Sequence, residues 1–155
     1  MKKDAHVCKK WRMTMKRFLA ALLSTILFAT IFSWVSYVPS SQQEPNVYYF
    51  GFFEISVFVI IYTAPVYFLV GLPISILIDK LVVNVDRDSK WTLYFIQLGL
   101  YSLAGVLVGF LYLLVFSGSI YLEGFISFSI YAIVASNLYF HMFLLVQKLS
   151  RKLYN

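Results

Sequence analysis

Four long apolar segments constrain the fold of this chain more than any other feature of its sequence. Each runs for roughly 21 to 27 residues with few charges, and together they cover residues 18–38, 52–78, 92–116 and 122–146. A helix needs about 20 apolar residues to cross the ~30 Å hydrocarbon core of a bilayer. The sequence therefore predicts an all-α fold, an integral membrane four-helix bundle.

The composition leads to the same prediction. Hydrophobic residues make up 61% of the chain and charged residues 13%, and the mean hydropathy is +0.78. A soluble domain has about 45–50% apolar and about 25% charged residues. The longest polar segment is the N-terminal arm, residues 1–17, which is too short for a separate soluble domain. We therefore expect a single membrane domain over residues 1–155.

The first apolar segment is predicted to be an uncleaved span. The apolar core of a secretory signal peptide is only about 7–15 residues long and leads to a cleavage site of small residues. Segment 18–38 is longer, and its end carries Trp34 and Tyr37. Aromatic side chains of this kind anchor helices at the membrane interface.

The basic residues predict the orientation. Seven of the thirteen Lys and Arg residues precede residue 18, three lie between 80 and 90, and three follow 147. With four spans all thirteen fall on one side, and Lys and Arg are enriched in cytoplasmic loops. Both termini are therefore predicted to be cytoplasmic. The net charge of +6 is then explained by attraction to the anionic surface of the lipid bilayer and does not indicate binding to nucleic acid.

Proline, glycine and loop length predict how the spans bend and pack. Pro65 and Pro73 interrupt the second span, so a kink is expected there. The five-residue turn 117–121 predicts an antiparallel hairpin of the third and fourth spans. Gly105 and Gly109 form a GxxxG helix-packing motif. Such a motif allows close helix contact, either within one bundle or at a dimer interface.

Four polar residues are predicted to lie near the cytoplasmic ends of the spans. Gln97 and His141 share a depth in the antiparallel hairpin, and Asn137 lies one turn deeper than His141. Asp79 ends the second span at the same boundary. Histidine titrates near neutral pH, so a buried network of Gln97, Asn137 and His141 is the best functional candidate. The alternative is that these side chains only join helices, at about 0.6–2 kcal/mol per hydrogen bond.

Two acids are predicted near the outer ends of the spans. Glu54 and Glu123 each lie about one turn inside the second and fourth spans. As neighbours they would raise one another's pKa and attract a cation. The alternative is that they never meet. A gap of roughly 15–20 Å without an ionisable residue separates the level of Glu54 from that of His141, which argues against a simple proton relay.

The sequence contains none of the common motifs of hydrolases, redox enzymes or nucleotide-binding proteins. It has no HExxH, CxxC or GxSxG motif and no phosphate-binding glycine loop. We expect no catalytic residues, no metal and no cofactor, and His6 in the arm is too far from His141 to share a metal with it. Cys8 is the only cysteine, so it is either a free thiol or a carrier of an acyl chain.

One short stretch carries a resemblance. Residues 71–79, GLPISILID, resemble a segment of small, uncharacterised four-span membrane proteins of Gram-positive bacteria. The likeness extends to chain length and span layout. It implies a bacterial plasma membrane, and it brings no known activity and no site residue.

Two classes of function remain. The preferred class is a non-enzymatic, multi-pass membrane protein that acts through contacts, as an accessory or immunity-type partner of another membrane component. The other class is a small transporter or channel made by self-association, because four spans with short loops seldom enclose a pore alone. The expected partners are therefore the lipid bilayer and either a second copy or another membrane protein.

Overall fold

The computed structural model of the chain is all-helical. It describes the backbone of residues 2–83, 89–116 and 122–153, and the side chains of residues 13–83, 89–114 and 124–152. Four helices in this part of the chain are long and apolar enough to span a membrane, namely Met13–Ser36, Phe52–Val83, Lys90–Leu114 and Gly124–Lys152. The predicted all-α fold and the predicted number of candidate spans are confirmed.

The second candidate span is built from three consecutive helical pieces. In chain order the elements are α1 (Lys2–Ser36), a short 3-10 turn η1 (Ser40–Gln42), α2 (Phe52–Val66), the π-helical turn η2 (Tyr67–Gly71), α3 (Leu72–Val83), α4 (Lys90–Phe116) and α5 (Leu122–Leu153). Because η2 continues directly into α3, these pieces form one bent rod.

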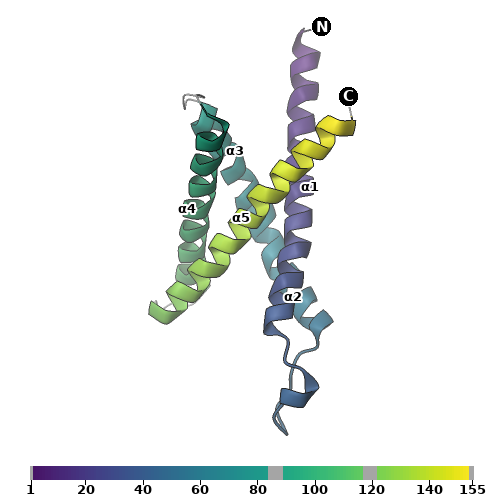
Figure 1. The fold of residues 1–155 in the computed structure, drawn as a ribbon, viewed down its shortest axis with the longest axis vertical. Coiled ribbons are helices and arrows are strands. Elements are labelled where there is room, and N and C mark those ends of the chain that lie inside the picture. The colour runs from purple at the N-terminus through teal and green to yellow at the C-terminus, as the bar shows by residue number, and fades with distance from the viewer. Residues whose placement is uncertain (1, 84–88, 117–121, 154–155) are drawn as a thin grey trace.

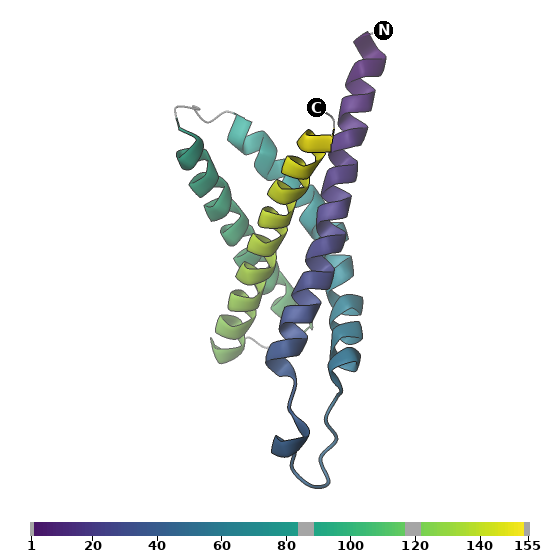
Figure 2. The same cartoon turned by 45° about the vertical axis from the view of Figure 1, so that its right-hand side comes forward.

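Consecutive rods run in opposite directions. The Lys2 end of α1, the C-terminal ends of α3 and α5 and the N-terminal end of α4 lie at one end of the molecule (Figure 1), which we call the basic end. The connection from α1 to α2 lies at the opposite end. Helices α1 and α4 diverge (Figure 2), and α5 packs against both of them, most extensively against α4.

The helices extend beyond the predicted spans. The second span was predicted to end at Asp79, but α3 continues through Val83, and Val82 is buried in the core. Helix α1 already begins at Lys2 in the predicted arm, and α5 runs to Leu153 in the predicted tail. Lysine and arginine are good helix formers, so these basic segments continue the helices that they flank.

The predicted kink between Pro65 and Pro73 takes the form of a π-helical turn. Proline has no N–H and cannot make the usual hydrogen bond to the carbonyl four residues earlier. The N–H of Leu72 donates to the carbonyl of Tyr67, five residues earlier. Such a turn holds one extra residue and often marks a functional site. Tyr67, where this turn begins, is buried inside the bundle.

The best-packed part of the core lies along α5. Phe140 is only 1% exposed, and its ring stacks on that of Tyr101 with the centroids 5.1 Å apart. Ala20 and Ala21 of α1 are fully buried. Small residues of this kind let helices approach closely when no water-driven force holds them together.

Candidate functional site

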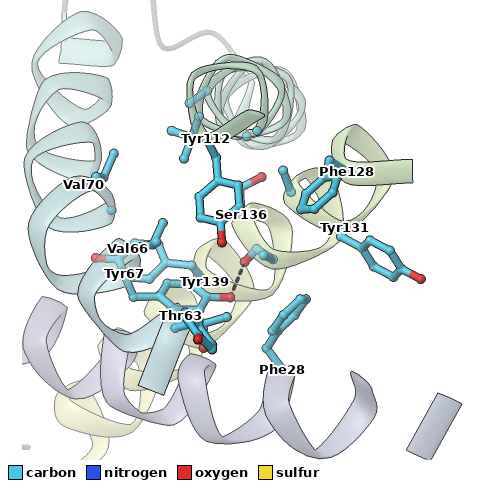
Figure 3. Close-up of a pocket in the computed structure, with 18 of the residues that line it drawn as sticks. Phe28, Thr63, Val66, Tyr67, Val70, Tyr112, Phe128, Tyr131, Ser136 and Tyr139 are labelled. Carbon is cyan, nitrogen blue, oxygen red and sulfur yellow. Dashed lines mark hydrogen bonds between the residues drawn. The ribbon is translucent and has the colours of Figure 1, made fainter. Parts of the chain in front are cut away.

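A cavity of about 370 Å³, which we call the central cavity, lies between the four candidate spans. All four candidate spans contribute to its lining, which is almost entirely apolar and aromatic. Phe28 of α1, Val66 of α2, Tyr112 of α4 and Phe128 of α5 surround it (Figure 3). Phe28 lies near the end of α1, and Phe128 near the beginning of α5. The cavity therefore occupies the half of the bundle that is further from the basic end.

Three tyrosines form a layer on the side of the cavity that faces the basic end. The ring centroid of Tyr139 lies 6.2 Å from that of Tyr67 and 6.0 Å from that of Tyr101. The Tyr67 hydroxyl donates to the carbonyl of Ala135 at 2.9 Å, and the Tyr101 hydroxyl donates to Ser75 Oγ at 3.1 Å. Hydrogen bonds between helices therefore fix Tyr67 and Tyr101 in this tyrosine layer. The buried Tyr139 hydroxyl has no hydrogen-bond partner among the described residues, and Tyr139 is held by its ring contacts.

The GxxxG glycines hold α4 close to α5 beside the cavity. A Cβ atom at Gly105 would lie 2.6 Å from both the carbonyl oxygen of Ala132 and Ser136 Oγ. A Cβ atom at Gly109 would lie 3.0 Å from Ala132 Cβ. This face is thus used for packing within the chain, the first of the two alternatives that the sequence left open.

An ion pair lies at the basic end. Arg17 Nη2 of α1 donates to Asp79 Oδ2 of α3 at 2.5 Å, and the two side chains are only 12% and 28% exposed. The Arg17 guanidinium also lies 5.8 Å from the ring centroid of Phe143 of α5, a cation–π contact. Arg17 therefore contacts two other helices with one side chain.

A second cavity of about 410 Å³ lies beside this ion pair. Arg17, Asp79, Lys80 and Gln97 supply its polar lining. Gln97 was predicted to join Asn137 and His141, but no hydrogen bond connects it to either of them in the part of the chain that the structure describes. Gln97 faces this cavity instead, so the predicted three-residue network is not formed.

His141 and Asn137 each bind to a different residue of α4. His141 Nε2 lies 3.0 Å from the Tyr94 hydroxyl, and Nδ1 lies 2.7 Å from the backbone oxygen of Asn137. Because a carbonyl only accepts, Nδ1 donates the hydrogen, and in a neutral imidazole Nε2 then accepts from the Tyr94 hydroxyl. Asn137 Nδ2 donates to Ser102 Oγ at 3.1 Å. His141 is exposed on the surface of the bundle, so the prediction that it is buried is wrong.

Glu54 caps the first turn of α2. Its Oε2 accepts the backbone N–H of Gly51 at 2.9 Å and lies 3.3 Å from the Tyr48 hydroxyl. A carboxylate is favoured at this end of a helix by the helix dipole. Its negative charge raises the pKa of the exposed Tyr48 phenol. The side chains of Glu123, the predicted partner of Glu54, and of Cys8 lie outside the described residues.

The sequence reasoning missed the pairing of Arg17 with Asp79 and the role of Tyr94. In the sequence Arg17 is one of the seven basic residues before residue 18, and Asp79 is predicted only to end the second span. The signal was present, since the two opposite charges lie at the same predicted membrane boundary, each next to an apolar segment. Tyr94 gave no comparable signal, because tyrosines are common near span ends.

Comparison with known proteins adds no relative to this description. No protein-family model, no curated protein and no solved structure matches the chain.

Proposed function

We propose that this chain is an integral membrane protein that crosses the bacterial plasma membrane four times with both termini in the cytoplasm. It acts without catalysis, by contact with another component of the membrane, as an accessory or immunity-type protein does. The observation that carries this proposal is the apolar cavity that all four candidate spans form together. A mostly apolar pocket of a few hundred Å³ is the usual form of a binding site for a hydrophobic molecule.

The outer faces of the helices support the membrane location. Large apolar side chains such as Leu69, Leu103 and Ile130 are more than half exposed. Soluble monomers rarely expose large contiguous apolar patches. In a bilayer the same side chains contact lipid tails, which are as apolar as they are.

The charge distribution supports the orientation. The basic N-terminal segment of α1, Lys80 of α3, Lys90 of α4 and the basic C-terminal turns of α5 are all near the basic end. The connection from α1 to α2, at the opposite end, contains Glu44 and no Lys or Arg. Basic residues are enriched on the cytoplasmic side of membrane proteins, so the basic end is assigned to the cytoplasm.

Cysteine labelling tests the orientation. Because Cys8 is the only cysteine, a Cys8→Ser chain provides a background for single cysteines at Ser41, Ser119, Ser89 and Ser150. A membrane-impermeant maleimide added to intact cells should label the variants at Ser41 and Ser119. Labelling at Ser89 or Ser150 before the cells are lysed would contradict the proposed orientation.

A matched pair of substitutions on α4 tests action through the cavity. Val108 lines the cavity, whereas its neighbour Leu107 is exposed on the outer face. Val108→Trp fills the cavity and should abolish complementation of a strain that lacks the chain. Leu107→Trp adds the same side chain outside and should complement fully. Full complementation by both variants, at equal protein levels, would contradict action through the cavity.

The oligomeric state separates this proposal from a pore made by self-association. Since Gly105 and Gly109 already pack against α5, a pore would need a different contact face. We expect the protein in lipid nanodiscs to have the mass of one chain and planar bilayers that contain it to show no conductance. A stable homo-oligomer with ion conductance would contradict the proposal and favour the transporter or channel.

A further inference from the structure

We propose that the central cavity binds one acyl chain of a membrane phospholipid, which enters sideways between α2 and α4 from the leaflet opposite the basic end. This inference rests on the proposed function, because it names the membrane component that the cavity holds. Four features of the cavity carry it, namely its chemistry, its length, its volume and its open side.

The chemistry of the lining calls for an apolar occupant. Several hydroxyl groups that line the cavity already donate to backbone oxygens, Thr63 to Val59 and Ser136 to Ile133 on their own helices and Tyr67 to Ala135 across to α5. The remaining surface is mostly aliphatic and aromatic. Water finds few hydrogen-bond partners in such a cavity. An apolar cavity therefore stays empty of water and can bind an apolar molecule.

The length of the cavity matches one leaflet. Its lining runs from Tyr101 to Tyr112 along α4 and from Phe128 to Tyr139 along α5. At 1.5 Å per residue each of these two stretches is about 16 Å long. Half of a ~30 Å hydrocarbon core is the same length. Along the second rod the lining runs further, from Phe58 to Ile74, so the cavity is at least as long as one leaflet. The tyrosine layer lies at the end of the α4 and α5 stretches that is nearer the basic end. An acyl chain from the opposite leaflet therefore does not have to pass this layer to enter the cavity.

The volume of the cavity is sufficient for a hydrocarbon chain. An apolar cavity of about 150 Å³ holds a benzene molecule. The central cavity measures about 370 Å³, so it has room for a longer, flexible hydrocarbon chain. Leaving such a void empty is unfavourable, because the cost of a cavity grows with its volume.

The open side of the cavity faces the lipid. Helices α2 and α4 flank this open side (Figure 3). The two helices are scarcely in contact in the part of the chain that the structure describes. Phe58 and Tyr62 of α2 line the cavity and yet are 49% and 65% exposed. An acyl chain of the surrounding leaflet can therefore reach the interior without crossing a polar surface.

Photolabelling with a phospholipid that carries a diazirine near the end of one acyl chain tests this inference. The full chain in nanodiscs is irradiated and the adducts are located by peptide mass spectrometry. Bulk lipid reaches the outward residues Leu103 and Ile130 in any case, whereas only a bound chain reaches Ala104 and Ala135 inside. We expect adducts at both inner positions. Adducts confined to the outward residues would overturn the inference, and this result needs no variant.

The matched pair on α4 provides the control. Val108→Trp should reduce the adducts at Ala104 and Ala135 at least tenfold and leave those at Leu103 unchanged, whereas Leu107→Trp should keep all of them. Unchanged inner adducts in Val108→Trp would overturn the inference. Inner labelling by a free diazirine fatty acid with none by the phospholipid would overturn it as well.

The same variants separate this inference from the proposed function. If Val108→Trp loses complementation but keeps its inner adducts, the acyl-chain site is wrong and action through the cavity stands. If it loses the adducts but complements fully, the acyl-chain site stands and the proposed function is wrong.

Discussion

The Arg17 guanidinium and the Asp79 carboxylate, 62 positions apart in the sequence, form the ion pair that joins α1 to α3 at the basic end of the bundle. Removal of one partner of a fully buried pair leaves an unpaired charge, which typically costs about 3–5 kcal/mol, whereas replacement of both by apolar residues is often neutral. Because this pair is only partly buried, the cost of removing one partner is smaller. The pair therefore predicts a strongly non-additive response to substitution.

Arg17→Met and Asp79→Leu should each lower the free energy of unfolding by about 1–3 kcal/mol, and the double variant should lower it by less than either one. Unfolding in mixed micelles with increasing dodecyl sulfate, followed by circular dichroism, measures this. Lys80→Met removes a neighbouring charge of α3 and should cost less than about 1 kcal/mol. A double variant that loses the sum of the two single effects would rule out a coupled pair.

Two glycines of α4 should respond oppositely to alanine. A Cβ atom at Gly105 would lie 2.6 Å from the Ala132 carbonyl oxygen, whereas a Cβ atom at Gly99 would meet nothing within 4 Å. Gly105→Ala should therefore destabilise the protein by about 1–3 kcal/mol, and Gly99→Ala should be neutral or slightly stabilising. The same unfolding assay checks both. Equal effects at the two positions would show that α4 does not approach α5 this closely.

His141 should tolerate glutamine at every pH. It lies on the surface of the bundle, and a glutamine amide keeps an acceptor for the Tyr94 hydroxyl. We expect His141→Gln to complement a deletion strain as well as the wild type does at each step from about pH 6 to 8, the range in which histidine titrates. A pH-dependent loss of growth with normal protein levels would instead indicate a proton-coupled role for this side chain.

The Glu54 charge should control the ionisation of Tyr48. It raises the pKa of that phenol above the ordinary value of 10.0, because a nearby carboxylate disfavours a second negative charge. Glu54→Gln should lower the pKa of Tyr48, so that near pH 10 a larger fraction of this phenol is ionised than in the wild type. Carbon-13 NMR of labelled tyrosine, assigned with Tyr48→Phe, measures the fraction. Glu44→Gln removes an acid from the same connection and should leave the pKa of Tyr48 unchanged.

The features that were predicted from the sequence depend on local chemistry. Apolar segment length predicted four candidate spans, and Pro65 with Pro73 predicted the bend in the second rod. The spacing of Gly105 and Gly109 predicted a close helix contact, although spacing alone did not indicate which helix it meets. Each of these features is fixed by residues within a few turns of one helix.

The features that were not predicted depend on helix rotation and crossing angle. Gln97 and His141 were placed at the same depth, but depth does not determine which way each side chain faces around its helix axis. One faces the cavity beside Arg17 and the other the surface of the bundle. The central cavity was not predicted either, because its lining comes from all four candidate spans and depends on how they pack against one another.

The π-helical turn Tyr67–Gly71 fixes the phase of α3 relative to α2. Each residue of an α-helix advances its side chain by about 100° around the axis, and this turn holds one residue more than an α-helical turn does. Without that residue, every side chain from Leu72 to Val83 would point about 100° away from its present direction, and Asp79 would turn away from Arg17. One inserted residue therefore allows the same rod to direct Tyr67 into the cavity at one level and Asp79 toward α1 at another.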